Sequence, residues 1–145
     1  MEKYSVTNLR YEYRDALVGF MRAMYEWESS GYTKSLAAFS DDSLGEGLEQ
    51  SMKNDLLLIF NKYVVEEGRN YDRVENTVCG RFPEYDLGSD EIEVCEDNGN
   101  SVSVIVRKKT GLRASFKLTL TMEGNECKVS RRDLQDGRRW QRTYV

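Results

Sequence analysis

The 145-residue sequence contains no histidine, one proline and three cysteines. Histidine is the commonest general base and the commonest metal ligand, so its absence excludes every Ser-His and Cys-His nucleophile pair. Catalysis would have to use carboxylate, lysine or tyrosine groups. A Gly-rich phosphate loop, an H-E-x-x-H pair, a nucleophile elbow and a calcium-loop spacing are also missing. These absences favour binding over catalysis, and we expect no cofactor and no bound metal.

The cysteines, Cys79, Cys95 and Cys127, are odd in number and form no C-x-x-C pair, so free thiols are expected. The longest apolar run, Leu56 to Phe60, is too short to span a bilayer. The N-terminal residues carry charges where a signal peptide needs an apolar stretch. We therefore expect a cytoplasmic protein with no membrane partner.

The net charge of −4 is unevenly distributed. Residues 1–72 contain 8 Lys and Arg against 13 Asp and Glu, whereas residues 73–145 contain 13 against 12. A globally acidic domain binds the phosphate backbone poorly and attracts basic proteins, so we expect a basic protein partner and no nucleic acid. The C-terminal arginines are interpreted as a salt-bridged sheet face: Arg131, Arg132, Arg138, Arg139 and Arg142.

Two amphipathic helices are indicated in the first half of the chain. Apolar residues recur at three- and four-residue steps from about Asn8 to Ser29, and Gly31 is placed just past the end of this helix. A second helix is predicted from about Ser43 to Glu67. Gly45 and Gly47 cost about 1 kcal/mol each relative to alanine in a helix interior, which predicts a break or a later start there.

After Asn70 the apolar residues alternate with period two, which is typical of strands. Four strands are predicted in succession, and a fifth, anchored by Trp140, follows the turn at Asp136 and Gly137. The predicted strands lie around Ile92 and Val94, from Val102 to Val106, from Ala114 to Met122, around Cys127 and Val129, and from Arg139 to Val145.

Hairpin registers are predicted by requiring the apolar residues to share one face. The first two hairpins then need three-residue loops that end at a left-handed glycine, Gly99 and Gly111. The third needs a two-residue loop that begins at Gly124. These registers pair Val94 with Val102, Val106 with Ala114, and Met122 with Cys127.

A sheet that is apolar on one face must be covered on that face, and the upstream helices supply the cover. We therefore predict an α+β fold in which N-terminal helices pack on a curled antiparallel β-meander. The helices would occupy about residues 8–69 and the sheet about residues 73–145. No repeat, linker or low-complexity tract divides the sequence, so residues 1–145 are expected to form a single domain.

An acidic tract stands out at the start of the sheet. From Glu84 to Asp97 there are seven acidic residues in fourteen and no Lys or Arg. A solvated face that discourages edge-to-edge pairing would explain the tract, as would a docking surface for a basic protein, and calcium binding is a weaker alternative. The candidate partner-binding residues are Glu84, Tyr85, Asp86, Asp90, Glu91, Glu93, Glu96 and Asp97.

The motif R-F-P-E-Y-D at Arg81–Asp86 resembles immunity proteins of bacterial polymorphic toxin systems that have the nuclear transport factor 2-like fold. The motif D-G-R-R-W at Asp136–Trp140 is similar to the D-G-K-W turn before the closing strand of that family. The likeness covers about residues 50–145. One departure is at Cys127–Ser130, where such proteins often have a tryptophan. The resemblance implies a cystatin-like cone with helices across its mouth, and a protein that neutralises a toxin by binding it.

The first functional hypothesis is therefore an immunity protein, monomeric or homodimeric, that binds and neutralises a cognate basic toxin. The alternative on the same fold is a small-ligand-binding protein or an enzyme of the ketosteroid isomerase or dehydratase type. Such an enzyme would need an Asp or Glu of raised pKa inside the cone, beside a tyrosine hydroxyl. A third possibility is a secretion chaperone or adaptor that presents its acidic surface to many partners.

Overall fold

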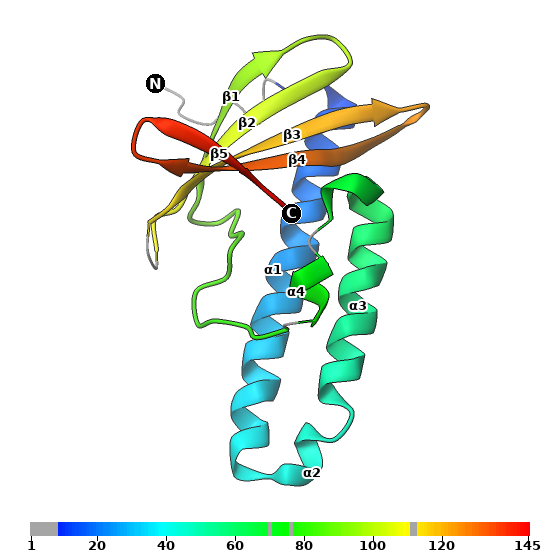
Figure 1. The fold of residues 1–145 in the computed structure, drawn as a ribbon, viewed down its shortest axis with the longest axis vertical. Coiled ribbons are helices and arrows are strands. Elements are labelled where there is room, and N and C mark those ends of the chain that lie inside the picture. The colour runs from blue at the N-terminus through cyan, green and yellow to red at the C-terminus, as the bar shows by residue number, and fades with distance from the viewer. Residues whose placement is uncertain (1–8, 70, 76, 111–112) are drawn as a thin grey trace.

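The computed structural model describes residues 9–69, 71–75, 77–110 and 113–145, in which helices lead and a sheet follows (Figure 1). This arrangement confirms the predicted α+β fold. The sheet is open and antiparallel, and its strands lie in sequence order. The helical elements are α1 (Tyr11–Ser40), α2 (Asp42–Gly45), α3 (Leu48–Tyr63), the 3-10 turn η2 (Glu66–Gly68) and α4 (Tyr71–Glu75), and the strands are β1 (Glu91–Asp97), β2 (Ser101–Arg107), β3 (Ser115–Glu123), β4 (Glu126–Asp136) and β5 (Arg139–Thr143).

Helix α1 continues beyond the predicted end at Gly31 and reaches Ser40, so the prediction of a helix end at Gly31 was wrong. Gly31 is buried inside the helix. A Cβ atom at this position would lie 2.5 Å from Met52 Cε and 2.7 Å from Cys79 Sγ. The glycine therefore permits close packing of α1 against α3 and the segment around Cys79.

The second predicted helix is divided, as the glycine pair indicated. Gly47 has φ 76° and separates α2 from α3. Helix α3 ends at Tyr63, four residues before the predicted end, because the next residues leave the helix to join the sheet. Val64 forms a parallel bridge with Val129, and the Val65 amide donates to the Val129 carbonyl at 2.9 Å.

The predicted register of the first hairpin was wrong by two residues. Val94 lies opposite Val104 instead of Val102. The Asn98 amide donates to the Ser101 carbonyl at 2.9 Å, and Gly99 is left-handed as predicted, with φ 90°. A β-bulge between Val94 and Glu96 takes up the extra residue in β1.

The second hairpin is also shifted by two residues, since Val106 pairs with Phe116 and not with Ala114. The Lys108 amide donates to the Ala114 carbonyl at 2.9 Å, so the loop is longer than three residues. Gly111 lies outside the described residues; among the described residues of this loop, Arg113 is left-handed, with φ 54°.

The third register is confirmed, because Met122 pairs with Cys127 around a left-handed Gly124. The fifth strand pairs with β4 after the turn at Gly137, which is also left-handed. Trp140 is only half-buried, and the Lys117 ammonium lies 4.8 Å from the centroid of its ring. The fully packed residue at this end of the chain is Val145, so Trp140 is not the anchor that the sequence indicated.

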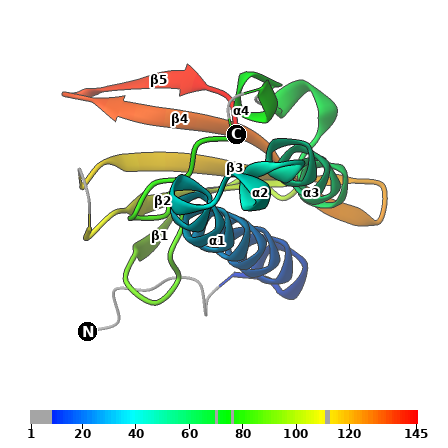
Figure 2. The ribbon, with the colours of Figure 1, turned by 90° about the horizontal axis from the view of Figure 1, so that it is seen from below.

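The core lies between the helices and one face of the sheet, and α1 and α3 run side by side beneath that face (Figure 2). A two-residue register shift leaves every side chain on its predicted face, because side chains alternate with period two. The buried apolar residues of the strands are therefore all among the predicted ones: Ile92, Val102, Val104, Val106, Phe116, Leu118, Leu120 and Val129.

The α1–α3 pair extends well past the sheet, with α2 at its far end (Figure 1). The half of α1 nearer the sheet contributes large core residues such as Tyr13, Leu17 and Phe20. Helix α2 contributes no buried residue. In the part of the chain that the structure describes, no helix combines the length and the apolar character needed to cross a bilayer.

Replacement of Gly31 by alanine should destabilise the fold. Alanine favours the helix by about 1 kcal/mol, but its methyl group would overlap two buried sulfur-containing side chains, so a net loss of about 1–2 kcal/mol in the free energy of unfolding is expected. Urea unfolding measures this loss of stability. The control Gly45→Ala places its methyl group 3.5 Å from Ala38 Cβ, which is ordinary contact, and should cost nothing. Equal stabilities for the two variants would contradict the packing role of Gly31.

Candidate functional site

Three of the predicted acidic residues lie on the outer face of β1, which is an edge strand. Glu91 and Glu93 point away from the helices by simple alternation with buried Ile92. Glu96 would fall on the core face without the bulge after Val94, and it reaches the outer face, opposite Ser103, because of it. The bulge therefore brings three carboxylates onto one surface and sets the next acid, Asp97, opposite Val102 at the end of the strand.

Most acids of the tract have cationic neighbours from other elements. Glu93 pairs with Arg107 at 2.7 Å, Glu91 with Lys109 at 2.6 Å, and Asp97 with Arg10 at 3.3 Å. The linear sequence does not reveal these pairs, because the cations come from β2, the loop after it and the start of α1. The outer face of β1 is therefore acidic but partly neutralised, and exposed pairs of this kind contribute little to stability.

Two predicted site residues are buried. The Asp90 carboxylate accepts from Lys108 at 2.7 Å and from the Asp86 amide at 2.8 Å. Burial raises the Asp90 pKa, and Lys108 opposes that shift. Tyr85 packs edge-on against Phe20 and Phe116, with ring centroids 5.0 and 5.3 Å away. Both residues fasten their segment to the core and are not available to a partner at the surface.

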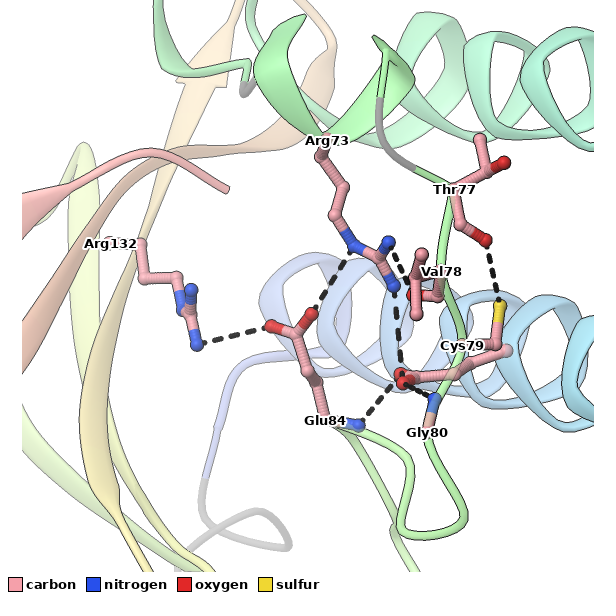
Figure 3. Close-up of polar contacts among 8 residues, drawn as sticks. Arg73, Thr77, Val78, Cys79, Gly80, Glu84 and Arg132 are labelled. Carbon is pink, nitrogen blue, oxygen red and sulfur yellow. Dashed lines mark hydrogen bonds and ion pairs between the residues drawn. The ribbon is translucent and has the colours of Figure 1, made fainter.

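Asp86 is half-buried and shapes its own loop, because its Oδ1 atom accepts from the Gly88 amide at 3.0 Å. Glu84 occupies a different position, near Arg73 of α4 and Arg132 of β4 (Figure 3). It lies between two guanidinium groups, 3.4 Å from Arg73 Nε and 3.3 Å from Arg132 Nη2. Three of the predicted residues thus lie on the outer face of β1 and two are buried, whereas Glu84, Asp86 and Asp97 belong to neither group.

The residue that holds the segment carrying Glu84 is not directly indicated by the sequence. Glu28 of α1 is 5% exposed, and its carboxylate accepts from the Glu84 amide at 2.9 Å and from the Gly80 amide at 3.3 Å. Arg73 Nη2 lies 3.9 Å away. Burial raises the Glu28 pKa, and its hydrogen bonds with the backbone oppose the shift. The available signal is an acidic residue on the helical face that also carries Trp27 and Met24.

Arg132 was expected on a salt-bridged sheet face; it does pair with Glu84, but it lies on the core face of β4. A register shift after Val129 is the reason, since it sets Arg131 opposite Thr119 and Arg132 opposite buried Leu118. The Arg132 guanidinium lies 4.6 Å from the Phe116 ring centroid, and its Nε atom has no hydrogen-bond partner. Arg131 pairs with Asp133 at 3.0 Å, as a salt-bridged face predicts.

A cavity of about 330 Å³ adjoins Glu84, Phe116 and Arg132. The described residues that line it include no tyrosine, and its carboxylate is already engaged by two guanidinium groups. The carboxylate and tyrosine pair that an isomerase of this fold requires is therefore not assembled there. Among the described residues, no group of three or more Cys, Asp or Glu side chains is arranged to hold a metal ion.

Comparison with known proteins agrees with this geometry. A family model described as an NTF2 fold immunity protein matches residues 12–143, which includes the helices and all five strands. Searches of curated proteins and of solved structures gave no significant match.

The buried carboxylate of Glu28 should give the stability a measurable pH dependence. Because burial raises its pKa above the ordinary 4.5, its contribution to stability is complete below that value and is lost as pH rises through the raised pKa. Glutamine does not titrate. The loss of unfolding free energy in Glu28→Gln should therefore be largest near about pH 4 and smaller near about pH 7.

Chemical denaturation at a series of pH values tests this prediction. Glu66→Gln, the same substitution at an exposed glutamate on η2, serves as the control. Titrating groups common to both proteins, such as Asp90, cancel in the difference. A loss in Glu28→Gln that grows with pH would mean that the fold favours the charged carboxylate.

Proposed function

The chain belongs to the family of NTF2 fold immunity proteins, and on that premise we propose that it binds a cognate toxin domain and thereby neutralises it. The observation that carries the proposal is a family match extending over nearly the whole chain, from residue 12 to residue 143. The described residues around the cavity assemble no acid–base pair, which supports inhibition by binding rather than by chemistry.

We place the contact on the outer face of β1, with a basic toxin as the partner. Glu93 and Glu96 are exposed there, and Glu91 is half-buried beside them. The net charge of −4 adds an attractive field for a basic protein. Because Glu93 is already paired with Arg107, this surface would act mainly on the rate of association and on partner choice, and less on the lifetime of the complex.

The charges on edge strand β1 can also be explained without a binding partner. Charged side chains and a bulge on an edge strand prevent edge-to-edge aggregation. The two roles make different predictions for binding. Charge reversal on β1 slows the approach of a basic toxin only if that approach follows the field of this face. Protection against aggregation needs no particular effect on toxin binding.

The double variant Glu93→Lys, Glu96→Lys should associate about tenfold more slowly with the toxin domain encoded immediately upstream, measured by surface plasmon resonance at low salt. The dissociation rate should change less. The matched control reverses two exposed acids elsewhere, Asp55 on α3 and Glu66 on η2, to lysine. Circular dichroism verifies the fold of both variants.

Slowing by the same factor in both double variants would indicate an effect of net charge alone and would remove the outer face of β1 as the interface. An unchanged rate in the β1 variant would have the same consequence. Failure of the wild-type protein to bind that toxin domain would contradict the proposed function itself.

A further inference from the structure

The helical pair formed by α1 and α3 ends in a region that contributes no fully buried residue to the core. At about 1.5 Å per residue, the thirty residues of α1 extend about 45 Å, and Figure 1 shows its last turns well beyond the sheet. We call residues 35–49 the distal tip. It contains the end of α1, all of α2 and the start of α3. No residue of α2 is buried.

Large apolar side chains are nevertheless exposed on the distal tip. Phe39 is 89% exposed, and Leu36 and Leu44 are each more than half exposed. Leu36 and Phe39 are three residues apart on α1 and therefore share a helical face. Helix α2 packs closely beside α1, since a Cβ at Gly45 would touch Ala38 at 3.5 Å. Single exposed apolar residues are common, but a group at the end of a projecting hairpin is typical of a contact surface.

The apolar surface continues into a groove beside the tip. This groove has a volume of about 370 Å³ and is lined by Leu48 and Met52 of α3 and by Val78, among others. Val78 is itself 75% exposed. A partner that covered Phe39 could therefore also cover apolar surface on α3 and on the segment after α4.

The surroundings of this apolar surface are acidic. From Ser35 to Met52 the sequence contains four acidic residues and no Lys or Arg. Glu75 lines the groove as a fifth acid. Lys53 partly offsets these charges by bridging Glu49 and Glu75 at 3.4 and 3.5 Å. The acids of the tip segment are Asp41, Asp42, Glu46 and Glu49.

We propose that the distal tip is an apolar anchor that docks on the cognate toxin domain, at a surface with an apolar centre and a rim of lysine or arginine. The proposal rests on the proposed function and adds a second contact surface, at the end of the molecule opposite the sheet. The acidic rim selects a basic partner. It also disfavours a second copy of this chain, because a symmetric contact would bring like charges together.

The distal tip and the outer face of β1 would affect binding differently. An exposed aromatic residue that becomes buried acts chiefly on the dissociation rate, whereas charges act on the association rate. Leu36, Phe39 and Leu44 of the tip are exposed in the free protein, so their replacement leaves the core contacts of α1 intact. Loss of binding in such a variant can therefore be separated from loss of folding.

Phe39→Ser should weaken binding of the upstream-encoded toxin domain at least about 30-fold, mainly through faster dissociation in surface plasmon resonance. The matched control is Leu58→Ser, an apolar residue of α3 that is 67% exposed and lies outside the tip, which should bind as the wild type does. The double variant Asp42→Lys, Glu46→Lys should lose affinity and lose part of its salt dependence.

Wild-type affinity in Phe39→Ser, with the wild type binding normally, would overturn the tip as an anchor and leave the proposed function intact. Unchanged affinity and salt dependence in the Asp42→Lys, Glu46→Lys variant would overturn the basic rim.

Sedimentation of the protein alone provides a further test. A dimer that Phe39→Ser abolishes would assign the tip to a second copy and overturn the toxin as its occupant. A wild-type protein that does not bind the toxin would contradict the proposed function.

Discussion

The buried carboxylate of Glu28 joins the helical half of this molecule to the segment that leads into the sheet. Glu28 sits on α1 at a position where the helix faces the interior, and it accepts from two backbone amides of the segment that leads into the sheet. A buried carboxylate is stable only when its acceptor capacity is used. That requirement fixes the segment from Gly80 to Glu84 against α1. The Glu84 side chain then lies between Arg73 of α4 and Arg132 of β4.

This network explains why part of the acidic tract is structural. Glu84 and Asp90 have cationic partners from β4 and from the residue after β2, and Tyr85 between them fills the core against Phe20 and Phe116. Charges used in this way hold the chain and are not available to a partner. The acids nearer the surface follow Asp90, on β1, where the bulge turns Glu96 outward. Within this one run, the acidic residues Glu84 and Asp90 before β1 thus stabilise the fold, and those of β1 lie nearer the surface.

The sequence predicted features that depend on local periodicity. Side-chain alternation determined which face of each strand is buried, and a two-residue error in register did not alter it. The registers of the first two hairpins could not be predicted, because they depend on a bulge after Val94 and on a loop longer than its glycine suggested. The role of Gly31 depends on Met52 and Cys79, which are distant in the sequence. The burial of Glu28 has the same origin, since its partners are more than fifty residues away.

The same arrangement separates the parts of the molecule that maintain the fold from those that are free to change. The core beneath the sheet and the network at Glu28 occupy α1 from Tyr13 to Gly31, whereas α2 contributes no buried residue. Substitutions on α2 therefore lose little packing energy, because surface replacements away from buried contacts usually alter stability by about 0.5 kcal/mol or less. A protein that must match one particular partner needs such a region, where side chains can change without unfolding the chain. The distal tip meets that requirement better than the core face of the sheet, where Arg132 and Glu84 form an ion pair.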